Sequence, residues 1–175
     1  GHRRHTRGRG HRTRHAARQR RAGAGVGGHA GRGSMQDRIA RLLECGRRAS
    51  AGAGRSGGLA RIEAEPGRSL VEMATTEAMT NFQGICHGGY IALLADSAMG
   101  SALATVLPEG EKHMSFDLKL SFMRPVQIGQ AVRATGTVVH HGRRTAVGEC
   151  RLEVGGDLVG TGSASFIVYL PEKTS

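Results

Sequence analysis

One charged residue lies inside an otherwise apolar helical segment of this sequence. Asp96 is the single charged residue between Gly88 and Leu107, and its neighbours include Leu93 and Met99. A carboxylate among apolar side chains is costly to bury unless it is paired or used, and perturbed carboxylates are typical of active sites. An Asp on the solvent-facing stripe of a helix fits the same pattern equally well, so both interpretations stay open.

A histidine and two glycines, His87-Gly88-Gly89, stand where this helix is expected to begin. Glycines have no Cβ and let a ligand approach the backbone closely. The first N–H groups of a helix are unpaired and its dipole is positive there, so a substrate carbonyl would be polarised and a developing oxyanion stabilised. A plain glycine turn, with His87 as a structural cap, is the alternative for so short a motif.

The spacing between these two features predicts a site made by two chains. Asp96 lies nine residues after His87, which is ~13 Å further along a helix axis and about half a turn round. One carbonyl cannot easily meet both groups from a single chain. Antiparallel helices across a subunit interface would solve this, so we expect a homo-oligomer with shared active sites.

The rest of the sequence supplies the elements that position these groups. Helix 87–106 is rich in Ala, Gly and Ser, which lets a sheet approach its axis closely, and Pro108 and Gly110 end it. Its apolar face consists of Ile91, Leu94, Ala95, Ala98, Met99, Ala102 and Leu103. Strands are expected at 59–65, 68–75, 113–123, 130–140, 144–154 and 157–169. Long antiparallel strands after one buried helix indicate an α+β fold, with a sheet curled around the helix.

The strand at 113–123 has the strongest pattern. Met114, Phe116, Leu118, Leu120 and Phe122 alternate with polar residues over eleven positions. Because side chains alternate across a strand, we expect these five on one continuous apolar face.

The motifs together resemble one family. Asn81-x-x-Gly84-x-x-His87-Gly88-Gly89, followed by Asp96 in a small-residue helix, resembles the hotdog thioesterases of the PaaI type (phenylacetate-degradation-related). Segments 115–125 and 142–145 are similar to that family's central strand and next hairpin, and the resemblance covers roughly residues 59–170. It implies the hotdog fold, a curved antiparallel sheet around one long central helix, and hydrolysis of acyl-coenzyme A thioesters in dimers or dimers of dimers.

The resemblance also implies roles for single residues. Asp96 would be the general base or the nucleophile, and the sequence does not separate these. Gly89 and Gly88 would supply the polarising amide, Asn81 would hold the thioester or the water, and His87 would orient the site.

Four further residues follow from the same resemblance. Ser115 would position water near Asp96 on the partner side. Arg143 and Arg144, and also Arg124, would meet the phosphates of coenzyme A, for which Arg suits bidentate contact; ordinary solvated surface is the alternative. No cofactor is expected, since coenzyme A is part of the substrate.

Other chemistries have less support. A hotdog protein that binds acyl-CoA without catalysis, as a sensor or scaffold, is the main alternative, although such a binder has no need of Asp96. A hydratase would need a different His motif. Cys86 precedes His87, but adjacent residues seldom face one another and no activating partner is evident. His140 and His141 are strand neighbours that point to opposite faces, so no metal site is expected.

Composition limits the partners. Residues 1–34 hold ten Arg and no acid, so the formal charge of +11 falls to +1 for residues 35–175. We expect a disordered extension over 1–34, a helix and linker over 35–58, and the catalytic domain over 59–175. Nucleic-acid binding would rest on the extension alone. The three cysteines are irregularly spaced, which argues against a disulfide framework. The sequence shows neither an apolar run of ~18 residues nor a signal peptide, so we expect a cytoplasmic protein without a membrane partner.

Overall fold

A computed structural model describes residues 34–37, 39–41, 43–44 and 58–171 of this chain. Residues 35–37, 39–41 and 43–44 are helical, within the stretch where a short amphipathic helix is expected. The Arg-rich segment 1–33 and the linker residues 45–57 lie outside the described residues, so the predictions for them stay predictions.

The ordered elements follow the predicted sequence of strands and one helix. Two strands, a short 3₁₀ turn, one long helix and four strands run along the chain as β1 (Leu59–Glu65), β2 (Arg68–Ala74), η1 (Glu77–Met79), α2 (Gly88–Val106), β3 (Lys112–Phe122), β4 (Ala131–His141), β5 (Thr145–Val154) and β6 (Asp157–Tyr169). Each predicted boundary from residue 59 onward is met to within one residue. Pro66 and Gly67 form the β1–β2 turn, with Gly67 at a positive φ of 75°.

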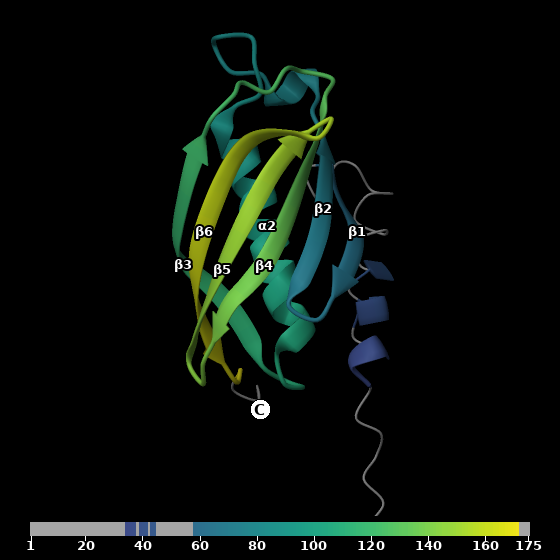
Figure 1. Cartoon of the computed structure of the whole chain (residues 1–175), viewed down its shortest axis with the longest axis vertical. Helices are drawn as coiled ribbons and strands as arrows, with labels where there is room; N and C mark the ends of the chain where they lie inside the picture. The colour runs from purple at the N-terminus through teal and green to yellow at the C-terminus, as the bar shows by residue number, and fades with distance from the viewer. Residues whose placement is uncertain (1–33, 38, 42, 45–57, 172–175) are drawn as a thin grey trace, which may run out of the picture. The chain divides into compact units, whose positions relative to one another are not determined.

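The six strands make one antiparallel sheet in the order β1-β2-β4-β5-β6-β3. Figure 1 shows this sheet curving around α2, which lies against its inner face. The predicted α+β fold is therefore confirmed. Among the described residues, β1 and β3 are the outermost strands of the sheet.

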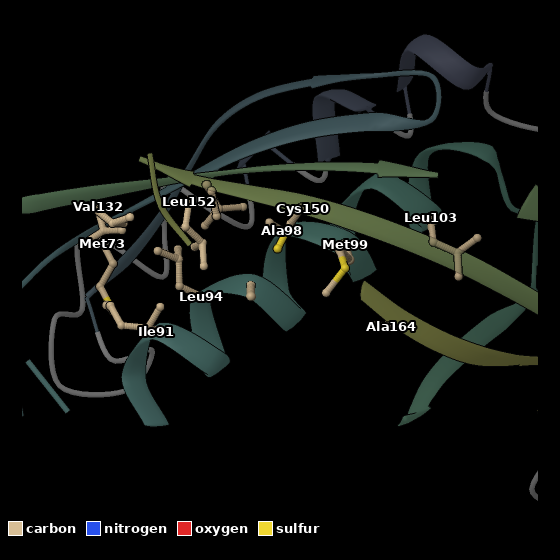
Figure 2. Packing of buried hydrophobic residues seen from close by; sticks show 14 of the residues in the cluster. Met73, Ile91, Leu94, Ala98, Met99, Leu103, Val132, Cys150, Leu152 and Ala164 are labelled. Atoms are coloured by element: carbon tan, nitrogen blue, oxygen red, sulfur yellow. The ribbon is translucent and has the colours of Figure 1, made fainter. Parts of the chain in front are cut away.

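Small residues bring the sheet unusually close to the helix. A Cβ built on Gly136 in β4 would lie 2.5 Å from the carbonyl carbon and oxygen of Ala98 in α2, so only glycine fits there. Leu94, Ala98 and Met99 are fully buried beneath the sheet, as Figure 2 shows. The small side chains of the helix thus allow the close approach that the composition predicts.

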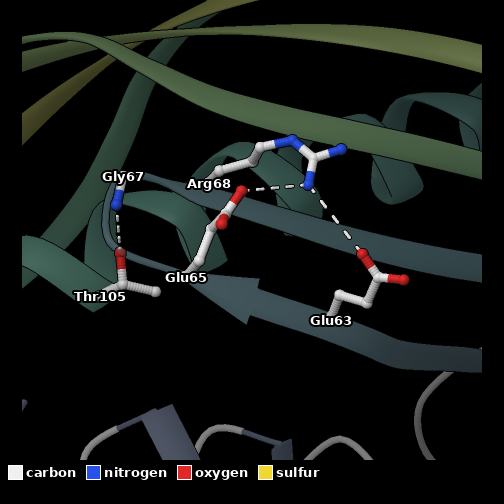
Figure 3. A network of polar contacts seen from close by, with 5 residues as sticks. All are labelled: Glu63, Glu65, Gly67, Arg68 and Thr105. Carbon is white, nitrogen blue, oxygen red and sulfur yellow. Dashed lines mark hydrogen bonds and ion pairs between the residues drawn. The ribbon is translucent and has the colours of Figure 1, made fainter. Parts of the chain in front are cut away.

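Hydrogen bonds fix the helix along its length. Ser69 Oγ in β2 donates to the carbonyl oxygen of Ala98 at 2.8 Å, in a buried position. Near the helix end, Thr105 Oγ1 accepts from the Gly67 amide at 2.7 Å and donates to Ala102 O at 2.6 Å. Figure 3 shows the Gly67–Thr105 bond beside exposed ion pairs of Arg68 with the glutamates of β1. The bonds of Ser69 and Gly67 to α2 hold the helix, and with it Asp96, in a fixed position relative to the sheet.

Helix α2 is also long and apolar enough, by length and composition, to cross a membrane, with a mean hydropathy of 1.3. A search for an uninterrupted run of ~18 apolar residues does not detect this helix, whereas its mean hydropathy does. However, 56% of that window is buried inside the protein, and a buried core helix passes the same test. Its apolar character is accounted for by the sheet that covers it.

Strand β3 forms as predicted, but its single apolar face does not. A β-bulge between Ser115 and Asp117 shifts the register against β6. Ser115 pairs with buried Phe166, whereas beyond the bulge Leu118 pairs with buried Ala164. Because directly paired residues share a face, both Ser115 and Leu118 point towards the helix side.

The bulge leaves apolar side chains on the surface. Met114, two residues before Phe116, is 57% exposed, and Phe116 is 59% exposed. The expectation of one continuous apolar face is therefore wrong, because one extra residue in a strand reverses the alternation beyond it.

Candidate active site

His87 is the N-cap of helix α2. Its Nδ1 accepts a hydrogen bond from the Gly89 amide at 2.9 Å, and its carbonyl accepts from the Tyr90 amide at 3.0 Å. An accepting Nδ1 places the proton of the neutral ring on Nε2. The cap therefore occupies the Gly89 amide, one of the two predicted for carbonyl polarisation.

The Gly88 amide remains for a ligand. Within the described residues it makes no hydrogen bond, as is typical of the first helical residue. Gly88 lines a cavity of about 400 Å³ together with Asn81, Phe122 and Arg124. A Cβ at position 88 would lie 3.2 Å from the Phe122 ring, so the backbone here is packed closely against the end of β3.

Asn81 shapes the loop that covers this cavity. Its Oδ1 accepts hydrogen bonds from the amides of Gln83 at 2.8 Å and Ile85 at 3.3 Å. Both contacts use the oxygen, so the Nδ2 group is the part of the side chain that can donate to a ligand. The structure thus brings together the predicted residues Asn81, Gly88 and Arg124.

Asp96 lies in a second groove of about 410 Å³, which it shares with Ser115 and His113. The residue is half-buried, and its Oδ1 is fully buried without a hydrogen-bond partner among the described residues. A buried, unsatisfied carboxylate oxygen is expensive in a purely structural role. Of the two interpretations open from the sequence, the functional one is favoured.

His113 is a groove residue that the sequence analysis did not single out. Its ring packs edge-on against Phe166 with centroids 5.6 Å apart. Burial lowers the pKa of His113, while the Asp96 carboxylate and the Gly100 carbonyl act in the opposite direction. The signal was available in the sequence, because His113 lies two residues before Ser115 and therefore on the same side of the strand.

The predicted site residues thus divide between two places on one chain. Asp96 and Ser115 line one groove, while Asn81 and Gly88 line another cavity. Among the described residues, Asn81 and Gly88 do not line the groove of Asp96. Asp96 and Ser115 likewise do not line the cavity of Gly88. This agrees with the helical spacing, which separates Asp96 from the helix start.

The three arginines expected at coenzyme A also divide. Arg124 follows β3, lines the first cavity and pairs with Asp157 at 3.3 Å. Arg143 and Arg144 are exposed in the β4–β5 turn. That turn lies at the opposite end of the sheet, because β5 runs ten residues, or about 30 Å, from it towards Asp157.

The remaining candidates are Cys86 and the pair of His140 and His141. Cys86 is 5% exposed, and burial raises the pKa of its thiol, which favours a small core residue over a nucleophile. Over the described parts of the chain, no group of three or more His, Cys, Asp or Glu side chains is arranged to hold a metal ion.

Comparisons with known proteins give the same family as the motifs. The sequence model of the thioesterase superfamily matches residues 83–161. A Pseudomonas aeruginosa protein provisionally named an esterase is 30% identical over 102 residues, which is 58% of this chain and 75% of that protein. This chain belongs to the thioesterase superfamily.

Two further relatives of this superfamily chain refine the comparison. Human acyl-coenzyme A thioesterase 13 is 32% identical over 85 residues, 49% of this chain and 60% of the relative, so the chain spans about 60% of the first curated relatives' length. A mutant of the phenylacetic acid degradation protein PaaI from Thermus thermophilus superposes with a TM-score of 0.58 at 27% identity, over 62% of this chain and 91% of that one. The hotdog fold and the PaaI-type resemblance are confirmed.

Proposed function

We propose that this protein is an acyl-CoA thioesterase, which hydrolyses the thioester of an acyl-coenzyme A to the free acid and coenzyme A. The observation that carries the proposal is the buried Oδ1 of Asp96, which has no hydrogen-bond partner in the described part of the chain and lies beside Ser115 in an open groove. The superfamily and the name of the human relative support the same chemistry.

The proposed active unit is a homodimer that pairs through β3. This strand is an edge of the sheet, and an exposed edge offers unpaired backbone groups to another chain. It also carries large apolar side chains in solvent, among them Met114 and Phe116, which lie side by side on its outer face and are 57% and 59% exposed. Adjacent exposed apolar residues typically mark an interaction surface.

Two-fold pairing of β3 would join the two half-sites. Gly88 lies against Phe122 at the C-terminal end of β3, whereas Asp96 shares its groove with Ser115 near the other end. Edge strands related by a two-fold axis run antiparallel, so the Phe122 end of one meets the Ser115 end of the other. The Gly88 amide would then face the partner subunit's Asp96.

The proposed roles follow from the donors that remain available. The Gly88 amide and Asn81 Nδ2 donate to the thioester oxygen, where negative charge develops as the carbonyl is attacked. Asp96 is the base that takes a proton from water, or the nucleophile. Ser115 helps to position the water, and His87 orients the helix start through its bond to Gly89. A C–O bond forms, the C–S bond breaks, and the thiolate leaves as coenzyme A.

The same pairing gives a place for coenzyme A. It would bring the partner subunit's Arg143 and the partner subunit's Arg144 to the end of β3 that carries Arg124. Phosphates of coenzyme A would meet this cluster through charge-assisted hydrogen bonds. We further propose assembly of such dimers into a dimer of dimers, a cytoplasmic location, and no cofactor beyond the coenzyme A of the substrate.

Thiol release from a panel of acyl-CoA substrates tests the function. We expect Asp96→Asn to lower kcat by at least ~10²-fold, since a base or nucleophile is lost. Glu109→Gln, an exposed carboxylate-to-amide change in the loop after α2, is the matched control and should leave turnover unchanged. Unchanged turnover in Asp96→Asn contradicts the mechanism. Tight acyl-CoA binding without any turnover by the wild-type protein would instead support the non-catalytic binder.

A further inference from the structure

His113 occupies a defined position beside Asp96. It lies in β3 before the bulge and pairs with buried Val168, which places its side chain on the helix side of the sheet. A Cβ at Gly100 would lie 3.0 Å from His113 Cε1, so the imidazole packs directly on the helix backbone at that glycine. Gly100 is four residues after Asp96, and residues four apart share one helix face.

The contacts of the ring determine which nitrogen can accept a hydrogen bond. One ring nitrogen of His113 interacts with the Gly100 carbonyl oxygen, an acceptor that requires an N–H. In the neutral ring the other nitrogen then carries the lone pair. The groove that His113 lines also contains Asp96, whose buried Oδ1 has no hydrogen-bond partner among the described residues. Among the described residues, an imidazole nitrogen and a carboxylate oxygen that can each accept a hydrogen bond therefore line one groove.

We infer that His113 is a positioning residue that holds the hydrolytic water together with Asp96. This inference rests on the proposed thioesterase function and deepens it. The water donates one hydrogen to Asp96 and the other to the free ring nitrogen, which leaves an oxygen lone pair for the thioester carbon. As the C–O bond forms, Asp96 takes the proton from the water, and the sulfur leaves with the electron pair of the C–S bond.

The role requires a neutral imidazole, because a protonated ring is a donor at both nitrogens. Burial lowers the pKa of His113 below the ordinary histidine value, while the Asp96 charge opposes this shift. The charged side chains that line the same groove are Asp96 from α2 and Arg61 from β1. Turnover should therefore fall as the pH drops through the lowered pKa of His113 and the water-holding nitrogen becomes protonated.

Kinetic pH profiles test the inference. We expect His113→Asn to lower kcat/KM at neutral pH by about 10²-fold, the size typical of a misplaced reactant, and to lose an acidic limb that we expect for the wild-type protein below the ordinary histidine pKa. His113→Gln, whose longer amide offers an acceptor, should keep more activity than His113→Ala. His141→Asn, an exposed histidine at the end of β4, is the matched control and should keep the wild-type profile. An unmoved acidic limb in His113→Asn, or equal losses in the Gln and Ala variants, would overturn the inference.

A titration that needs no turnover separates this inference from the proposed function. The pKa of His113, followed by NMR of the ring protons, should fall in Asp96→Asn, since the carboxylate that favours the charged ring is removed. A wild-type protein that hydrolyses no acyl-CoA but shows this shift contradicts the function and leaves the Asp96–His113 pair intact. A protein that hydrolyses acyl-CoA with a His113 pKa insensitive to Asp96→Asn contradicts the inference alone.

Discussion

Gly136 of β4 lies directly over the carbonyl group of Ala98 in α2, so close that an added Cβ would be 2.5 Å from both the carbonyl carbon and oxygen. Backbone atoms cannot move aside as a flexible side chain can. Ala98 is two residues beyond Asp96, and its carbonyl oxygen also accepts the buried bond from Ser69. This contact therefore fixes the height of the helix near Asp96 beneath the sheet.

Gly136→Ala should destabilise the protein. The added methyl group meets the helix backbone, and overpacking of this kind typically costs ~1–3 kcal/mol. Urea unfolding measures the change. Gly148→Ala in β5 is a suitable control, because its Cβ would meet mainly the Met99 side chain, at 3.2 Å, and should cost less. Equal stability of Gly136→Ala and the wild-type protein would mean that the sheet is not held against the helix as described.

Sequence patterns predicted the elements well because each is a local property. The alternation in 113–123 and the small-residue helix were both visible without knowledge of the neighbours. The bulge after Ser115 was not, because it arises from pairing with β6, which follows some forty residues later in the chain. The alternation rule fails wherever an extra residue is accommodated by a partner strand.

Sequence patterns indicated candidate site residues but not the hydrogen bonds that these residues make. The sequence offered His87 as either a site residue or a cap, and the structure makes it a cap that occupies the Gly89 amide. The choice depends on a ring orientation, which spacing does not determine. The spacing of His113 from Ser115 indicates that the two share one side of the strand, but it does not indicate which helix residues lie opposite. Only the approach of β3 to Gly100 brings His113 to Asp96.

Asn81→Asp should separate the two functions of that side chain. Aspartate keeps the oxygen that accepts from Gln83 and Ile85, so the loop should hold its conformation, but it loses both Nδ2 donors. Loss of one oxyanion donor typically lowers kcat by 10²–10³-fold, and we expect a loss of about that size. Asn81→Ala should add a loss of thermal stability. Full activity in Asn81→Asp would exclude Nδ2 from carbonyl polarisation.

Phe116→Lys should weaken the proposed dimer. The side chain is 59% exposed on the edge strand β3, and burying a Phe contributes roughly 1.5–3 kcal/mol, once in each subunit. Analytical ultracentrifugation should therefore show a dissociation constant raised by about 10²-fold or more. Val139→Lys is the control, because Val139 is similarly exposed but lies on β4, away from this edge. An unchanged dimer in Phe116→Lys would move the interface away from β3.

The buried thiols should be unreactive in the folded protein. Burial raises the pKa of Cys150 to about 11 and also raises that of Cys86. At pH 8 the Cys150 thiolate is then about 10⁻³ of the total, so alkylation should be slow until the chain unfolds. Mass spectrometry of the modified peptides, with and without denaturant, measures this. Cys86→Ala should keep turnover close to that of the wild-type protein, and a large loss would revive Cys86 as a functional residue.

A mixture of two inactive variants tests the shared site most directly. A heterodimer of Asp96→Asn and Asn81→Asp contains two shared active sites. One site carries both substitutions. The other site combines the native Asp96 of one chain with the native Asn81 of the other. After subunit exchange, about a quarter of all sites should be intact in a two-fold dimer, and turnover per site should recover to that fraction. Sites built within one chain would recover nothing, because each chain of the mixture carries one lesion. Mixing either variant with itself is the control and should stay inactive.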